Sequence, residues 1–397
     1  QLEQSSTVGE YIPTTSTINS APRFDHNPTT GECLGLLVEE QRTNLGLYSQ
    51  AIHVTNWGTQ QASLQTLNAA TSPDGFLNAS LLYENTQNAS RFIAQAIAVT
   101  NAAYTVSIYA KKKERNRIMF RESSVSGTSA TFDLSTGTVV GSEGSPTTSV
   151  QALAGGWYRC AMTYTPSAAS SRLHAVYLMP DSGVSFATAT YAGDGASGLY
   201  LFGFQVELGS FPTSYTATST AAATRSADVA SITGTAFSSW YRQDEGTWFS
   251  EYAPIYTATA SVPPNTPHVM QVYNAAVATN NYATRGAGNN ANQEFVARNP
   301  TSGAQFPNVP NIGYGAAGVT RKSAYGIDAA SLNTSANGSV TSTSVNNAAA
   351  LMATHDTLAV GSGTGGTPPY QLNGTLRRLA FFPQRLPNST LQAITQL

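Results

Sequence analysis

Short runs in which hydrophobic and polar residues alternate, separated by Gly, Asn, Ser and Pro, dominate the chain from residue 46 to about residue 216. In the run from Tyr104 to Tyr109, Tyr104, Val106 and Ile108 face one way and the residues between them face the other. The same period of two recurs at 117–121, 157–164 and 199–208. Strands of this length and spacing, with almost no helical periodicity, predict an antiparallel sandwich of jelly-roll type.

The pattern changes after residue 216, where an Ala/Thr/Ser-rich stretch gives way to a second β-rich region. In that region Asn373-Gly374 is a strong hairpin signal, and Pro387 to Ile394 predicts a helical turn capped by Asn388 or Ser389. Residues 280–347 show little period, and we expect short strands and long loops there. The fold class predicted is all-β, with two antiparallel β-sandwich domains in tandem behind an extended N-terminal lead-in. The boundaries are a lead-in at 1–45, a jelly roll at 46–216, a linker at 217–227 and a second sandwich at 228–397.

Composition excludes several classes of function. The chain has 397 residues, of which 41% are hydrophobic and 11% charged, so it can build cores. Its net charge is −2, with no basic excess, so nucleic acid is not an expected partner. No apolar run approaches the roughly 18 residues of a membrane span, so membrane insertion is not expected. The first residues lack the pattern of a signal peptide. Cys33 and Cys160 lie far apart in the sequence and are expected to be free thiols.

The most distinctive stretch runs from Pro22 to Leu45. It contains Arg-Phe-Asp-His, a polar turn, and then Gly-Leu-Leu-Val-Glu-Glu-Gln-Arg-Thr-Asn-Leu. The charged and amide residues from Glu39 to Asn44 follow a short apolar run, as at the end of a strand. Carboxylate and guanidinium groups in such a patch are expected to anchor neighbouring backbone.

This stretch, together with 156–160, 203–215 and 224–228, resembles a family of bacteriophage head-spike and tail-fibre proteins with a carbohydrate-binding-module-like jelly roll. Segments in the second half, around Gly246-Thr247-Trp248 and 372–382, are similar to concanavalin/laminin-G-like sandwiches. The resemblance implies a virion structural protein at the surface of the extracellular phage particle. It further implies a homo-oligomer, with a trimer favoured, that binds other virion proteins and host cell-surface polysaccharide.

A glycan site needs aromatic rings for stacking and planar polar groups for hydroxyls. We expect Tyr104, Val106 and Ile108 to lie in the core, together with Phe202, Phe204 and Val206. Alternation then places polar and aromatic side chains of the same strands on the opposite face. The candidate carbohydrate-binding residues are Tyr109, Arg121, Trp157, Arg159, His174 and Gln205. Because a subunit interface uses the same residue types, a purely architectural virion protein is the first alternative.

The second alternative is an enzyme, a capsular polysaccharide depolymerase, which would need two nearby carboxylates. Glu245 and Glu251 flank a predicted strand and are the candidates, but the resemblance there is to non-catalytic modules. We therefore expect no enzyme activity and no required cofactor. Asp74 or Asp194 could bind a structural calcium ion. The alternative for each is an aspartate that only stabilises its own turn. A secreted bacterial adhesin is a further alternative.

Overall fold

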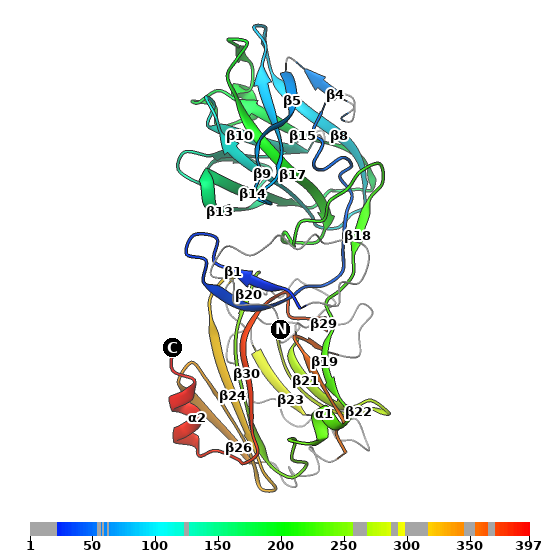
Figure 1. The fold of residues 1–397 in the computed structure, drawn as a ribbon, viewed down its shortest axis with the longest axis vertical. Helices are drawn as coiled ribbons and strands as arrows, with labels where there is room; N and C mark the ends of the chain where they lie inside the picture. Colours follow the sequence, from blue (N-terminus) through cyan, green and yellow to red (C-terminus); the bar gives the residue numbers. More distant parts are fainter. Residues whose placement is uncertain are drawn as a thin grey trace.

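The computed structural model describes residues 22–53, 57, 59–61, 63–122, 127–256, 268–286, 293–297, 317–344, 354–363 and 370–397. Strands predominate and form two sandwiches, one above the other along the longest axis (Figure 1). This confirms the all-β fold class. The described helical segments are short: η1 (Ala154–Gly156), η2 (Phe186–Thr188), α1 (Thr235–Ser238) and α2 (Asn388–Ile394). None of the described helices is long and apolar enough to cross a membrane.

The first sandwich consists of two six-stranded antiparallel sheets. Sheet I contains, in spatial order, β12 (Thr138–Glu143), β11 (Thr128–Asp133), β10 (Arg117–Glu122), β15 (Ser170–Met179), β8 (Arg91–Val99) and β4 (Thr59–Gln61). Sheet II contains β13 (Thr147–Ala152), β14 (Trp157–Tyr164), β9 (Tyr104–Lys112), β17 (Gly198–Leu208), β6 (Leu77–Glu84) and β5 (Ser63–Thr71). A small ladder pairs β7 (Asn88–Ala89) with β16 (Tyr191–Ala192).

The core between sheets I and II confirms most of the alternation. Val106 and Ile108 of sheet II pack with Ile118 and Phe120 of sheet I, all four buried. The expectation for Phe202 is wrong, because it packs on the outer face of sheet II. Gly203 has φ of 66° and the register between β17 and β9 shifts there, which breaks the period of two.

The second sandwich also has two antiparallel sheets. Sheet III contains β1 (Phe24–His26), β2 (Cys33–Val38), β30 (Gly374–Phe382), β20 (Gly246–Pro254), β24 (Arg321–Ile327), β25 (Ser331–Ala336) and β26 (Ser339–Ser344). Sheet IV contains β19 (Ala230–Thr233), β27 (Thr357–Val360), β21 (His268–Asn274), β22 (Val277–Gly286) and β23 (Gln293–Ala297). A further ladder pairs β28 (Ser362–Gly363) with β29 (Tyr370–Gln371).

The predicted C-terminal helical turn is present as α2, but its cap differs from the prediction. Pro387 occupies the N-cap position, where no side chain bonds to the helix. Asn388, a predicted cap, instead accepts a hydrogen bond from Arg385 at 2.6 Å. Of the weakly patterned region 280–347, several strands are described, and residues 287–292, 298–316 and 345–347 lie outside the described residues.

The prediction that residues 1–45 form a lead-in separate from both sandwiches is wrong for β1 and β2, which belong to the second sandwich. β2 pairs with β30, placing Leu36 opposite Leu376, and Val38 is buried against Leu372 and Leu376 in the core of the second sandwich. Residues 24–38 are therefore part of sheet III, and the first sandwich is inserted between β2 and the rest of the second. Alternation along the chain predicts strands but not distant pairing partners, which is why the sequence could not show this. Residues 1–21 of the expected lead-in lie outside the described residues.

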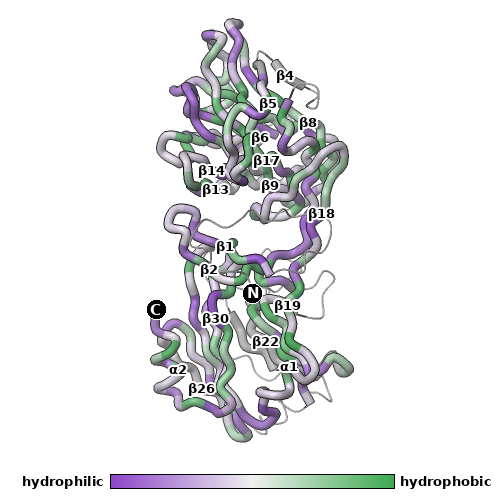
Figure 2. Tube along the Cα trace, in the orientation of Figure 1, coloured by the Kyte–Doolittle hydropathy of each residue, from purple (hydrophilic) through white to green (hydrophobic). Residues whose placement is uncertain are grey.

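The two sandwiches are joined by a pair of strands rather than by one linker. β3 (Arg42–Asn44) pairs antiparallel with β18 (Ala223–Arg225), which comes from the stretch expected to be a linker. Figure 1 shows the two running side by side between the sandwiches, and Figure 2 shows hydrophilic colour near β18. Phe211 stacks on Tyr256 at 4.6 Å between ring centroids with an interplanar angle of 6°, adding an apolar contact across the junction.

Candidate functional site

The six predicted carbohydrate-binding residues do not form one face. Tyr109, Trp157, Arg159 and Gln205 lie on sheet II, on β9, β14 and β17, whereas Arg121 and His174 lie on β10 and β15 of sheet I. The structure therefore divides the predicted surface between the two sheets of the first sandwich.

The outer face of sheet II is covered by the segment that follows β17. Gln205 is buried and donates to Glu207 Oε1 at 2.8 Å, and the same carboxylate accepts hydrogen bonds from the backbone and hydroxyl of Thr213. Arg159 donates to the Thr213 carbonyl at 2.7 Å. The expectation that Gln205 is exposed is therefore wrong, because residues 211–216 use these polar groups to pack onto the sheet.

The aromatic residues of this face are covered as well. Trp157 is 3% exposed, packs with Phe202 and Tyr215, and donates from its indole nitrogen to the Thr71 carbonyl at 3.2 Å. The Tyr109 ring lies 6.1 Å from that of Tyr215, and the Arg159 guanidinium lies over it at 5.3 Å. Trp157 is thus wrongly predicted as exposed, and Tyr109 and Arg159 hold the exit segment in place. Alternation assigns a side chain to a face but does not show what packs on that face.

His174 is wrongly placed in the prediction, since it faces the core of the first sandwich. Its Nδ1 lies 3.1 Å from the Arg172 carbonyl and must donate to it, so Nε2 accepts the Tyr164 hydroxyl at 2.5 Å. Burial lowers the pKa of His174 to about 4. A neutral, internally hydrogen-bonded imidazole stabilises the core and is not available to a ligand.

Arg121 is the predicted residue that remains at the surface in an arrangement suited to a sugar. Its guanidinium carbon lies 3.5 Å from the centroid of the Phe186 ring, and Phe186 is 37% exposed on η2. Tyr177 of β15 meets Phe186 edge-on at 5.8 Å, and Phe92 of β8 lies 4.8 Å from Tyr177. Burial raises the pKa of Tyr177, although a hydrogen bond with Arg121 opposes the shift. We call Arg121, Phe186, Tyr177 and Phe92 the Arg121 surface.

A carboxylate lies at the rim of the Arg121 surface. Glu143 of β12 accepts hydrogen bonds from the Ser129 hydroxyl at 2.7 Å and from the Phe186 backbone at 3.4 Å, and Ser129 is the cross-strand neighbour of Arg121. In the described part of the chain Arg121 forms no ion pair with an acid. The surface thus combines the partly exposed Phe186 ring, a guanidinium group without an ion pair among the described residues, and a nearby acceptor. Sequence reasoning missed Phe186 because η2 lies in a loop without alternation.

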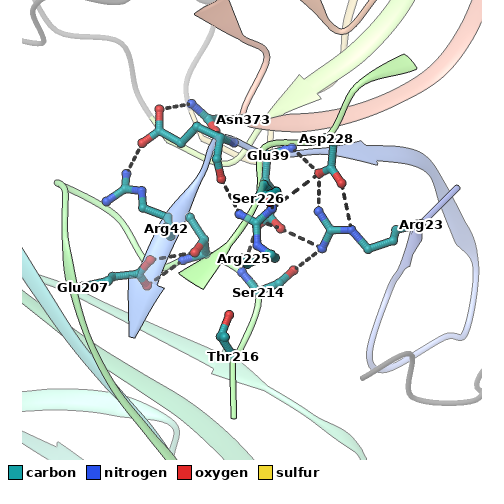
Figure 3. Close-up of polar contacts among 12 residues, drawn as sticks. Arg23, Glu39, Arg42, Glu207, Ser214, Thr216, Arg225, Ser226, Asp228 and Asn373 are labelled. Carbon is teal, nitrogen blue, oxygen red and sulfur yellow. Dashed lines mark hydrogen bonds and ion pairs between the residues drawn. The ribbon is translucent and has the colours of Figure 1, made fainter. Parts of the chain in front are cut away.

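A second polar cluster lies at the junction between the sandwiches (Figure 3). Arg23 donates to Glu39 Oε2 at 2.9 Å and to Asp228 Oδ1 at 3.2 Å, and it also binds the Ser214 hydroxyl. Arg225 lies 3.6 Å from the same Glu39 oxygen. Burial opposes ionisation of Glu39, but Arg225 and Arg23 outweigh it and hold the pKa below its ordinary value. These residues connect β2, the exit of the first sandwich and the start of the second.

The remaining polar residues of the stretch 39–44 anchor backbone, as predicted. The Arg42 side chain binds the Leu208 carbonyl, pairs with Glu40 at 2.5 Å and lies over the Phe211 ring at 4.8 Å. Asn44 donates to the Phe204 carbonyl at 3.1 Å and to the Thr216 carbonyl at 2.8 Å. These contacts hold the exit segment of the first sandwich against the strand that enters it.

Among the described residues, the other candidate groups are not gathered into sites. Glu245 directly precedes β20 and Glu251 lies within it, six residues further on, about 20 Å at strand rise, so the two cannot act on one glycosidic bond. Asp74 accepts from the Phe76 backbone at 2.9 Å and Asp194 from the Ala196 backbone at 2.8 Å, each within its own turn. The described residues contain no group of three or more His, Cys, Asp or Glu that could hold a metal ion, and the calcium expectation stays a prediction.

Comparison with known proteins gives weak likenesses only. Neither family models nor curated proteins match the chain. Among solved structures, the CBM40 of a Ruminococcus gnavus IT-sialidase bound to α2,3-sialyllactose is 16% identical, with a TM-score of 0.31, covering 39% of this chain and 83% of that one. Domains LG4–5 of the mouse laminin α1 chain are 11% identical, with a TM-score of 0.26, covering 97% and 96%. Neither of these is a phage protein, and TM-scores this low carry no weight for function.

Proposed function

We propose that this chain is a non-enzymatic structural protein of a bacteriophage particle, a tail fibre or head spike, that binds glycans during recognition of the host surface. The observation that carries the glycan-binding part is the Arg121 surface. A partly exposed Phe186 ring stacked with a guanidinium group, beside Tyr177 and Glu143, supplies both contacts that a sugar needs.

The phage part of the proposal rests on the sequence resemblance of 22–45 and 203–228. The residues of these segments that carry the resemblance, including Arg23, Glu39 and Asp228, meet in the junction cluster. The segments that carry the resemblance therefore form the junction between the two sandwiches. A firmly joined pair of domains is what we expect of a protein on the surface of a virus particle. In such a particle the chain would assemble as a homo-oligomer, a trimer in the first instance, on other virion proteins.

Binding of the purified chain to host cells and to extracted envelope polysaccharide tests the proposal, with a reducing-end assay on the same samples. We expect saturable binding without cleavage. Phe186→Ala and Arg121→Gln should each weaken it about five- to tenfold, the worth of one stacking or cation–π contact. Arg242→Gln is the control, because Arg242 is 43% exposed on the second sandwich, pairs with Asp244 and Glu245, and is remote from η2.

Each alternative has its own outcome in this experiment. Release of reducing ends would overturn the non-enzymatic assignment and favour the depolymerase. Absence of binding to any host polysaccharide, with normal assembly measured by light scattering, would favour the purely architectural protein. Binding that survives both Phe186→Ala and Arg121→Gln would show that the glycan site lies elsewhere.

A further inference from the structure

A hollow of about 120 Å³ lies in the second sandwich, beneath the β1–β2 hairpin. Asp25 and Leu34 of the hairpin form one side, and Tyr252, Pro254, Thr375 and Arg377 of β20 and β30 form much of the other. A hollow of this size has room for several water molecules or for one edge of a small polar molecule.

Asp25 is the unusual group in this hollow. Its Oδ1 accepts one hydrogen bond, from the His26 backbone at 2.9 Å, and the described residues provide no ion pair or further hydrogen bond for the carboxylate. Burial raises the pKa of Asp25 and outweighs the hydrogen bond from the His26 backbone and the charge of Arg23, both of which favour the ionised form. A partly desolvated carboxylate facing a hollow with unused acceptor positions is unfavourable unless a donor reaches it.

The other polar groups around the hollow complement a hydroxyl-bearing ligand. Thr320 and Thr375 offer hydroxyl groups that can donate or accept, and Arg377 offers N–H donors while it pairs with Glu32 at the surface. Leu34, Pro254 and Ile255 supply apolar walls. This mixture of one acceptor-only group, several donors and apolar walls is typical of sites for small polar ligands.

Charge narrows the class of ligand. An anion would be repelled by the carboxylate of Asp25. Arg377 already pairs with Glu32, and Glu39 with Arg23 and Arg225, so these groups offer no free charge to hold an ion. The described residues also contain no group of acids, histidines or cysteines that could hold a metal ion, which leaves a neutral, hydroxyl-bearing molecule. We propose that the hollow binds one neutral sugar unit edge-on, with ligand hydroxyls donating to Asp25 and accepting from Arg377 and the threonines. This site lies in the other sandwich from the Arg121 surface and does not depend on it.

Saturation-transfer NMR on the full chain tests the proposal, with D-glucose, D-galactose, N-acetyl-D-glucosamine and D-glucuronate as probes. At least one neutral sugar should bind with a dissociation constant in the millimolar range, and glucuronate should bind at least tenfold more weakly than glucose. Asp25→Asn keeps the shape of the side chain but removes its charge and one acceptor, and should weaken binding roughly tenfold. Thr320→Val should weaken it by a smaller factor. Cys33→Ser is the matched control, because Cys33 is exposed on the same hairpin and does not line the hollow.

The outcomes separate this site from the proposed glycan surface. Sugar binding that is lost in Asp25→Asn and kept in both Cys33→Ser and Phe186→Ala supports the hollow as an independent site. Loss in Phe186→Ala with no change in Asp25→Asn would assign the sugar to the Arg121 surface and overturn the proposal. Absence of binding by every neutral sugar, or equal binding of glucose and glucuronate, would overturn it too. Circular dichroism and the melting temperature of each variant show whether it has folded.

Discussion

Replacement of Glu39 by glutamine at the junction cluster should cost far more stability than its single charge suggests. Glu39 is 2% exposed and lies against Arg23 at 2.9 Å and Arg225 at 3.6 Å, which are 12% and 4% exposed. Glutamine keeps the shape but leaves two guanidinium groups with less negative charge. Removing one partner of a buried pair typically costs about 3–5 kcal/mol. Because Asp228 still neutralises Arg23, we expect the lower end of that range.

The pair of Glu32 with Arg377 provides the matched control. These two side chains are 53% and 47% exposed, so Glu32→Gln should cost less than about 1 kcal/mol. Urea unfolding, followed by tryptophan fluorescence and circular dichroism, measures both variants under identical conditions. The double variant Arg23→Met/Glu39→Leu, compared with each single change, isolates the coupling between the two groups.

The dependence on pH gives a second readout. Because the pKa of Glu39 in the folded chain lies below its ordinary value of 4.5, its stabilisation is fully present above that value. This stabilisation is lost as the pH falls through the pKa of Glu39 in the folded chain. The difference in unfolding free energy between Glu39→Gln and the unmodified chain should therefore shrink as the pH falls. A cost for Glu39→Gln no larger than that for Glu32→Gln would refute the view that the cluster holds the sandwiches together.

Three further predictions follow from burial and pairing. Burial lowers the pKa of His174 from 6.5 to about 4. Between these pH values the unfolded chain binds a proton at His174 and the folded chain does not, so the free energy of unfolding falls as the pH drops. Urea unfolding at pH 7 and at pH 4 measures this fall, which should be about 3 kcal/mol smaller in His174→Gln than in the unmodified chain. Cys33 is exposed and should react with a thiol reagent in the folded chain, whereas Cys160, whose pKa is raised by burial, should react only after unfolding. A chain that begins at residue 41 lacks β1 and β2, and circular dichroism should show loss of the second sandwich with retention of the first.

Alternation predicted the buried face correctly on strands of the first sandwich that have no bulge. Val106, Ile108, Ile118 and Phe120 are buried as predicted, since a period of two is a direct consequence of strand geometry. The failure at Phe202 comes from Gly203, whose positive φ shifts the register and reverses the order of faces. A single glycine within a strand can signal such a bulge, so this error could have been anticipated.

The candidate site was less predictable, because exposure depends on what covers a sheet. Trp157 and Gln205 point outward from sheet II but lie beneath residues 211–216, and nothing in their alternation indicates that cover. Arg121 was found because it alternates outward on β10, whereas its stacking partner Phe186 belongs to a loop. The junction was predicted as an anchoring patch at Glu39 to Asn44, but its partners on β18 and at Asp228 are distant in sequence.

Insertion of one sandwich into the other has a mechanical consequence that a tandem arrangement lacks. A single linker allows rotation about its backbone bonds, whereas two connections paired between β3 and β18 restrict that rotation. The stack of Phe211 on Tyr256 and the ion pairs around Glu39 would also have to separate. The separation between the Arg121 surface and the hollow at Asp25 should therefore vary less than it would across a single linker. If both bind sugar, a polysaccharide can engage them together only when its own stiffness and length match that separation, and the gain from double attachment is then set by geometry rather than by new contacts.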